Sequence, residues 1–213
     1  MRLRSADAGC VGEKNPANFQ SLSIIVMKER RLGRKPPCLA GQLLLAAPAL
    51  RDPNFKRSVI LLSAHSPEGA MGVVLNRPLK RQLAELNETF ARGPLAGVPL
   101  YCGGPVEPEQ LIIVSWQWLK AENAFQLHFG IDPEKAGELI GTPGLTLRAF
   151  LGYAGWTKGQ LENEMKQETW LTTGVEGRQL DDADGITLWR NLLCEHDPEL
   201  RFLANEPDDP SVN

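Results

Sequence analysis

The chain has 213 residues, of which 42% are hydrophobic and 23% charged, a composition typical of one globular domain. Residues 1–37 carry eight Lys or Arg against three acids, so the remaining chain has 15 basic and 23 acidic residues and a net charge of about −8. A body of that sign is repelled by a phosphate backbone, and we do not expect it to bind DNA directly.

The cysteines and histidines are dispersed along the chain, and no pair has the CxxC spacing of a zinc site. We therefore expect no disulfide framework, no metal and no cofactor. No apolar run approaches the roughly 18 residues that a membrane span needs. The apolar run 23–27 is too short for a signal peptide, and its basic cluster follows it, so we expect a cytoplasmic protein without a membrane partner.

The first 37 residues show no sustained periodicity and end in Pro36-Pro37, which predicts a flexible N-terminal extension. Either Met1 or Met27 could be the true start. We expect one globular domain over residues 38–205, followed by a loose acidic tail at 206–213.

The first half of this domain is predicted to be mainly β-structure. An apolar run over Leu39–Ala47 indicates a buried strand. Asp52-Pro53 is a helix-start signal that opens only a short turn. Runs at Val59–Ala64 and Met71–Leu75, joined through a turn at Ser66–Gly69, predict a hairpin, and Asn76-Arg77-Pro78 ends it.

A helix is predicted over Arg81–Ala91, where Leu83, Leu86 and Phe90 are three and four residues apart. The remaining elements before residue 145 are three strands and a second helix. The strands are expected at Leu100–Val106, Leu111–Trp116 and Ala124–Phe129. The helix is expected to begin at Asp132-Pro133 and to continue through Leu139.

An apolar strand over Leu145–Leu151 is predicted to enter a glycine-rich turn. Thr157 and Gln160 have capping-box spacing, so a helix should begin there. Trp170–Thr173 indicates a strand, and a last helix is expected near Asp184–Cys194. Its predicted core face consists of Ile186, Trp189, Leu192 and Leu193. Strands outnumber helices, and hairpins mix with crossovers, so the predicted class is α+β.

None of the common catalytic motifs is present: GxxxxGK[ST], GxGxxG, GxSxG, HExxH and HxE…PCxxC are all absent. We therefore predict no catalytic residue, and the sequence favours a protein that is not an enzyme.

The first candidate site lies at the two ends of the predicted hairpin. Antiparallel pairing would bring Arg57, Ser58, Asn76 and Arg77 together, where the arginines could bind a carboxylate or phosphate. Alternatively, the arginines cap strand ends and pair with nearby acids.

Two glycine turns are further candidates. The Cys102–Pro105 turn could expose a reactive thiol, or Cys102 could be a buried and inert residue. At the second turn, Gly155, Trp156 and Gln160 could hold an anion at a helix N-terminus. Equally, these glycines could only permit close strand–helix packing.

Four sequence blocks resemble the bacterial AlgH/YqgE family, in the family's order. They are Leu44–Pro48 with Asp52 and Phe55–Val59, Glu68–Pro78, Gly103–Val106, and Phe150–Glu162. The resemblance implies a single compact α+β domain with a mixed, partly closed β-sheet flanked by helices. It implies no agreed activity or cofactor, and the family is usually labelled uncharacterised or as transcriptional regulators.

Our leading hypothesis is a non-enzymatic cytoplasmic protein that acts through contact with a protein or small-molecule partner, and the family label suggests a regulatory role for that contact. The predicted contact surface combines Arg57, Asn76, Arg77 and the Gly155–Gln160 turn. The alternative is an enzyme or metabolite binder with an anion pocket at that turn.

Overall fold

The computed structural model describes residues 23–28, 38–122, 124–175, 180 and 185–205. Within these residues, ten strands form one sheet and five α-helices lie around it. The order is β1-β8-β7-β9-β4-β3-β2-β10, and β5 joins this path through β6, which pairs with β9. Among the strands of the described residues, only β6 and β9 pair in parallel, so the sheet is mixed. The predicted α+β class with a mixed, partly closed sheet is confirmed.

The strands are β1 (Ser23–Lys28), β2 (Leu43–Ala46), β3 (Val59–Ser66), β4 (Gly69–Val74), β5 (Pro78–Gln82), β6 (Pro99–Cys102), β7 (Val106–Leu119), β8 (Ala124–Phe129), β9 (Leu145–Thr157) and β10 (Trp170–Thr173). The helices are α1 (Glu88–Ala91), α2 (Pro133–Leu139), α3 (Gln160–Lys166), α4 (Gly185–His196) and α5 (Arg201–Ala204), with 3-10 turns at Leu83–Glu85 and Pro198–Leu200.

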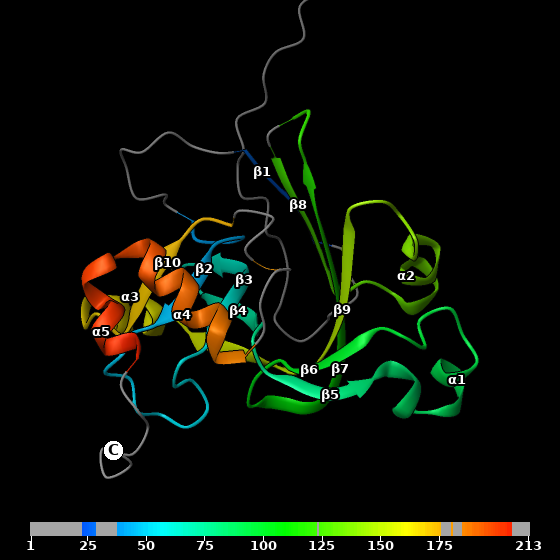
Figure 1. Ribbon diagram of the computed structural model, residues 1–213, viewed down its shortest axis with the longest axis horizontal. Coiled ribbons are helices and arrows are strands. Elements are labelled where there is room, and N and C mark those ends of the chain that lie inside the picture. Colours follow the sequence, from blue (N-terminus) through cyan, green and yellow to red (C-terminus); the bar gives the residue numbers. More distant parts are fainter. Residues whose placement is uncertain (1–22, 29–37, 123, 176–179, 181–184, 206–213) are drawn as a thin grey trace, which may run out of the picture.

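Strand β9 joins the two halves of the sheet. Its first part lies between β6 and β7, and its last residues pair with β4. The strand bends at Gly152, which has φ +71°. Figure 1 shows β2, β3, β4 and β10 on one side of this bend and β5, β6 and β7 on the other. The sheet therefore curls and encloses a core.

Glycines let the end of β6 cross β9. A Cβ on Gly103 would lie 2.1 Å from the carbonyl oxygen of Gly152, and one on Gly104 would lie 2.2 Å from the backbone of Tyr153. Only residues without a Cβ fit at this crossing. The glycines of two family blocks are thus explained by the close approach of two backbones.

The largest hydrophobic cluster lies inside the curl, since it combines side chains from both halves of the sheet with those of α4. Trp189 of α4 is fully buried there, and its Nε1–H donates to the Ala46 carbonyl over 2.8 Å. A second cluster lies between the opposite face of β2, β3 and β4 and helix α3. A third lies beneath α2 on the outer side of β6, β7 and β9.

Most predicted strands are confirmed, as are the hairpin of β3 and β4, the helix at α2 and the helix at α4. Asp132 caps α2 by accepting from the Glu134 N–H. The carbonyl of Asp52 accepts from the N–H groups of Phe55 and Lys56, which forms the short turn that was expected.

The predicted helix over Arg81–Ala91 is wrong. Residues through Gln82 belong to β5, a 3-10 turn follows, and α1 begins only after Asn87, whose side chain accepts from the Phe90 N–H. Leu83, Leu86 and Phe90 still pack on the third cluster, but from separate one-turn segments. Helical spacing of apolar residues therefore arose here without a continuous helix.

The glycine-rich turn was placed too early. Residues 152–157 continue β9, with Gly155 paired to Met71 and Trp156 to Ala70. Helix α3 begins at Gln160, and its N-cap is Gly159, with φ +72°. Backbone pairing with β4 extends β9 through the glycines as far as Thr157. Thr157 and Gln160 therefore mark the end of the strand and the start of α3, and not a longer turn.

Two smaller predictions also need correction. Ile186 is 38% exposed, and Leu188 instead joins the core face of α4. No element was expected before Cys38, yet β1 pairs antiparallel with β8. The rest of the predicted flexible extension and the acidic tail lie outside the described residues, so those interpretations stay predictions.

Candidate functional site

The ends of β3 and β4 meet in a strand-end junction formed by Arg57, Ser58, Asn76 and Arg77. Asn76 organises it: its Oδ1 accepts from the Val59 N–H over 2.9 Å, and its Nδ2 donates to the carbonyls of Arg57 and Gly185, each at 2.9 Å. Asn76 is 5% exposed. Its amide thus ties β3, β4 and the start of α4 together and is not accessible to a partner.

Ser58 and Arg57 also have structural surroundings. Ser58 is fully buried, and its Oγ has no hydrogen-bond partner among the described residues. Arg57 has φ +56°, and its guanidinium carbon lies 5.8 Å from the centre of the Trp189 ring. Arg57 is half-buried, so one edge of it reaches the surface of the junction.

Arg77 is the member of the junction that faces a pocket. Its Nη2 donates to the carbonyls of Pro53 at 3.2 Å and Lys56 at 3.4 Å. Among the described residues, no carboxylate forms an ion pair with Arg77. The alternative interpretation was an arginine paired with nearby acids. In the structure Arg77 is instead held by backbone carbonyls.

The pocket beside Arg77 brings two candidate sites together. Its volume is about 50 Å³, and it is lined by Asn54, Val74, Arg77, Cys102, Gly104 and Pro105. The Cys102 N–H donates to the Arg77 carbonyl at 2.9 Å, which holds the glycine turn against the junction. The sequence analysis did not single out Asn54, in the turn before β3, or Val74, the last residue of β4, because no motif marks either residue.

Gly155, Trp156 and Gln160 lie elsewhere. Gly155 and Trp156 pair with Met71 and Ala70 near the beginning of β4, whereas the junction follows the end of that strand. Trp156 is 7% exposed and packs against Phe55, with ring centroids 6.4 Å apart. Its Nε1–H donates to Glu164 at 2.8 Å, and the Trp170 indole donates to the same oxygen at 2.7 Å.

The start of α3 has its own polar partners. The Gln160 side chain accepts from the Thr157 N–H at 3.1 Å and donates to Glu164 at 2.9 Å. Glu162 lies in the first turn of this seven-residue helix, and its carboxylate lies 2.9 Å from the His65 Nε2. A negatively charged side chain thus already lies at the helix end that attracts anions.

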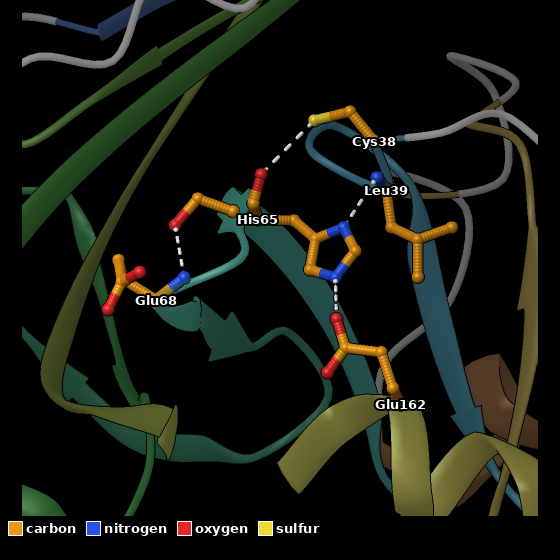
Figure 2. A network of polar contacts seen from close by, with 6 residues as sticks. Cys38, Leu39, His65, Glu68 and Glu162 are labelled. Carbon is orange, nitrogen blue, oxygen red and sulfur yellow. Dashed lines mark hydrogen bonds and ion pairs between the residues drawn. The ribbon is translucent and has the colours of Figure 1, made fainter. Parts of the chain in front are cut away.

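His65 of β3 forms a network that sequence analysis missed (Figure 2). Its Nδ1 accepts from the Leu39 N–H at 3.0 Å, and its Nε2 lies 2.9 Å from Glu162 of α3. A nitrogen that accepts from an N–H carries no proton, so the neutral ring has its proton on Nε2 and donates to Glu162. The ring, 11% exposed, joins the segment before β2 to α3.

This network does not form a thiol–imidazole pair. The Cys38 Sγ donates to the His65 backbone carbonyl at 3.3 Å, and both ring nitrogens are engaged by other groups (Figure 2). A base bonded to the sulfur is one way to activate a cysteine, and the His65 ring does not act as that base for Cys38. The geometry is therefore that of a structural connection.

We predict that this network gives stability an acid-range dependence. The backbone N–H of Glu162 and the hydrogen bond from His65 hold the pKa of this carboxyl below its ordinary value of 4.5. A lowered pKa in the folded state means that the contribution is present above 4.5 and is lost as pH falls through the lower value. Because Glu162 is 45% exposed, we expect less than about 1 kcal/mol.

Urea unfolding of the wild type and Glu162→Gln between pH 3 and 7 would measure this term. The stability difference between them should shrink as pH falls. In a His65→Gln background the same comparison should give a smaller change, because only the backbone hydrogen bond remains. An unchanged difference in that background would show that His65 does not contribute.

Arg148 is a buried cation that the sequence analysis overlooked. It is 6% exposed, and its guanidinium carbon lies 4.7 Å from the Tyr101 ring centre and 5.1 Å from that of Trp116. It donates to the carbonyls of Leu75 and Leu180. The available signal was a charge within the apolar run 145–151. Its place inside the curl indicates a role in holding β4 and β9 together.

Within the described part of the chain, no group of three His, Cys, Asp or Glu side chains has the geometry of a metal site. None of the described helices is both long and apolar enough to span a bilayer.

A family model described as AlgH-like (DUF179) matches residues 43–201, more than half of the chain. The chain belongs to the AlgH-like family. This confirms the resemblance, which rested on four short blocks.

Relatives of similar length support the AlgH-like assignment. A UPF0301 protein of Streptomyces avermitilis is 38% identical over 189 residues, covering 82% of this chain and 95% of the relative. One from Chlorobium luteolum is 33% identical over 181 residues, covering 82% and 94%. The UPF0301 label assigns no biochemical activity, so membership establishes the family and not a reaction.

Two solved structures share the AlgH-like fold. The solution structure of AlgH from Pseudomonas aeruginosa aligns with a TM-score of 0.59 at 24% identity, covering 84% of this chain and all of that one. A crystal structure from Corynebacterium diphtheriae gives a TM-score of 0.60 at 23% identity, covering 82% and 95%. At this identity the likeness supports the fold alone.

Proposed function

We propose that this AlgH-like protein is a non-enzymatic cytoplasmic protein that acts by contact with a partner at the pocket beside Arg77. The observation that carries the proposal is that three segments of the chain meet at one pocket. Asn54 and Arg77, together with the Cys102–Pro105 turn, come from three separate parts of the chain and line one pocket. Arg77 holds the loop through its Nη2, and its other guanidinium N–H groups have no acceptor among the described residues.

The contact surface is smaller than the one expected from sequence. Asn76 and Ser58 are buried, and Gly155, Trp156 and Gln160 lie at the other end of β4. Arg77 remains as the centre, with the exposed edge of Arg57 at its margin. A cationic centre on an otherwise acidic body favours a partner that presents negative charge there.

No observation supports the alternative of an anion pocket at Gly155–Gln160. The side chains at that turn hydrogen-bond to one another, and the first turn of α3 holds the Glu162 carboxylate. Regulation, as the family label suggests, would follow from the identity of the partner.

Site-specific crosslinking tests the proposal. A photo-crosslinking residue in place of exposed Arg51, in the loop that leads to Asn54, should give one discrete adduct in the cells that express the protein. The adduct should be lost in Arg77→Ala, because the cationic centre is removed. A crosslinker at exposed Lys135 of α2 is the positional control, since α2 lies in the other half of the molecule (Figure 1).

Arg92→Ala is the matched charge control, because Arg92 is 85% exposed and pairs only with Glu88 among the described residues. Its adduct should equal that of the wild type. Absence of an adduct at position 51, or an adduct that survives Arg77→Ala in a protein of unchanged thermal stability, would rule out the proposed contact.

A further inference from the structure

The pocket beside Arg77 has a size that limits its occupant. A buried water needs roughly 10–15 Å³ of such volume, so about 50 Å³ holds only a few non-hydrogen atoms. Sites for whole small molecules measure about 300–1,000 Å³. The pocket therefore fits one chemical group of a larger ligand and not a nucleotide or sugar.

Its walls differ in chemistry. Val74 and Pro105 are apolar, and Gly104 adds only backbone. Arg77 and exposed Asn54 supply the polar side chains, a guanidinium and a carboxamide. Since the Arg77 Nη2 makes both bonds to the loop carbonyls, Nε and Nη1 have no acceptor among the described residues. Guanidinium and amide donors at one small pocket match an acceptor with two oxygens.

We infer that the pocket binds a single carboxylate on a short aliphatic stem, as an acidic segment of the partner would present it through a glutamate side chain. This inference rests on the proposed function and names the chemistry of the same contact. The carboxylate oxygens face the donors of Arg77 and Asn54, and the stem lies along Val74 and Pro105. A phosphate fits less well, because its remaining oxygens would meet the apolar wall without hydrogen-bond donors.

Two features keep the pocket ready for this group. The bonds from Nη2 to Pro53 and Lys56 fix the direction of the Arg77 side chain, which lowers the conformational entropy lost on binding. The absence of a Cβ at Gly104 preserves both the crossing with Tyr153 and the space beside Cys102. The glycine turn of the third family block thus contributes to the pocket as well as to the fold.

The test is an NMR titration of the ¹⁵N-labelled full chain. N-acetyl-glutamate amide should shift the backbone amides of Asn54, Cys102 and Gly104 in a saturable way, with a dissociation constant of about the millimolar range for so small a fragment. The isosteric N-acetyl-glutamine amide should give no saturable shift. Propionate should bind at the same amides, which would show that the stem and carboxylate suffice.

Variants separate the pocket from general anion effects. Arg77→Ala should weaken binding at least tenfold, and Arg77→Lys should weaken it less, because it keeps the charge but loses the planar fork. Asn54→Asp puts a negative charge at the rim without removing the Arg77 side chain, and it too should weaken binding at least threefold. It also tests the inference if Arg77→Ala fails to fold. Arg92→Ala should bind as the wild type does.

Equal shifts with the glutamine analogue, or binding that survives both Arg77→Ala and Asn54→Asp, would overturn the inference. So would stronger binding of inorganic phosphate than of propionate. Carboxylate binding without an Arg77-dependent crosslink would support the pocket chemistry while contradicting the proposed function. An Arg77-dependent crosslink without carboxylate binding would contradict the inferred carboxylate ligand and leave the proposed function standing.

Discussion

Replacing Asn76 with Ala should destabilise the protein by about 3–5 kcal/mol. The change leaves the Val59 N–H and the carbonyls of Arg57 and Gly185 without their partner in a buried place. Each unsatisfied buried group costs about 1–3 kcal/mol, and partial access of water at the loop reduces the sum. Urea unfolding, with the midpoint and slope analysed together, measures the loss.

Asn87→Ala is the matched control, because Asn87 also accepts from a backbone N–H but caps the exposed helix α1. It should cost only about 1 kcal/mol. Asn76→Asp should be at least as harmful as Asn76→Ala, since a carboxylate would face two carbonyl oxygens. Equal effects at positions 76 and 87 would contradict the role assigned to Asn76.

Gly104→Ala should cost at least about 4 kcal/mol or prevent folding. Its Cβ would lie 2.2 Å from the Tyr153 carbonyl carbon and oxygen, and the glycine has φ +153°. Overpacking and a disfavoured backbone conformation act together here, and neither β6 nor β9 can move without breaking the sheet. Soluble yield and thermal unfolding report the effect.

Two glycines provide controls of graded severity. Gly97→Ala meets no heavy atom within 4 Å and should change stability by less than about 1 kcal/mol. At Gly155 the nearest atom would be 3.4 Å away, in the Tyr153 side chain, so Gly155→Ala should be tolerated. If Gly155→Ala were as harmful as Gly104→Ala, the crossing would not explain the family glycines.

These glycines show how far sequence patterns reached in this protein. The block Gly152–Gly159 was interpreted as a strand-to-helix turn, because glycines usually interrupt regular structure. In the folded chain, pairing with β4 carries the strand through Gly155 and Trp156. Local preference for a turn was outweighed by hydrogen bonds to a strand about 85 residues earlier, which no local window contains.

The candidate site was also predictable only where local pairing decides the structure. The hairpin predicted the meeting of Arg57, Ser58, Asn76 and Arg77, because antiparallel pairing alone places them together. The hairpin pattern could not show that the Asn76 amide closes the junction while Arg77 faces a pocket. Burial separates these roles, and burial depends on α4 and on the turn at Cys102, which are far away in sequence.

The sequence by itself determined the family, the α+β class and most of the strands, since these depend on periodicity and on short motifs within a dozen residues. Only the tertiary structure decided that β9 continues through its glycines, that His65 and Arg148 are connecting residues, and that Arg77 lines a pocket with Cys102. Each of these depends on contacts between segments at least 25 residues apart, whose geometry arises only when the sheet curls.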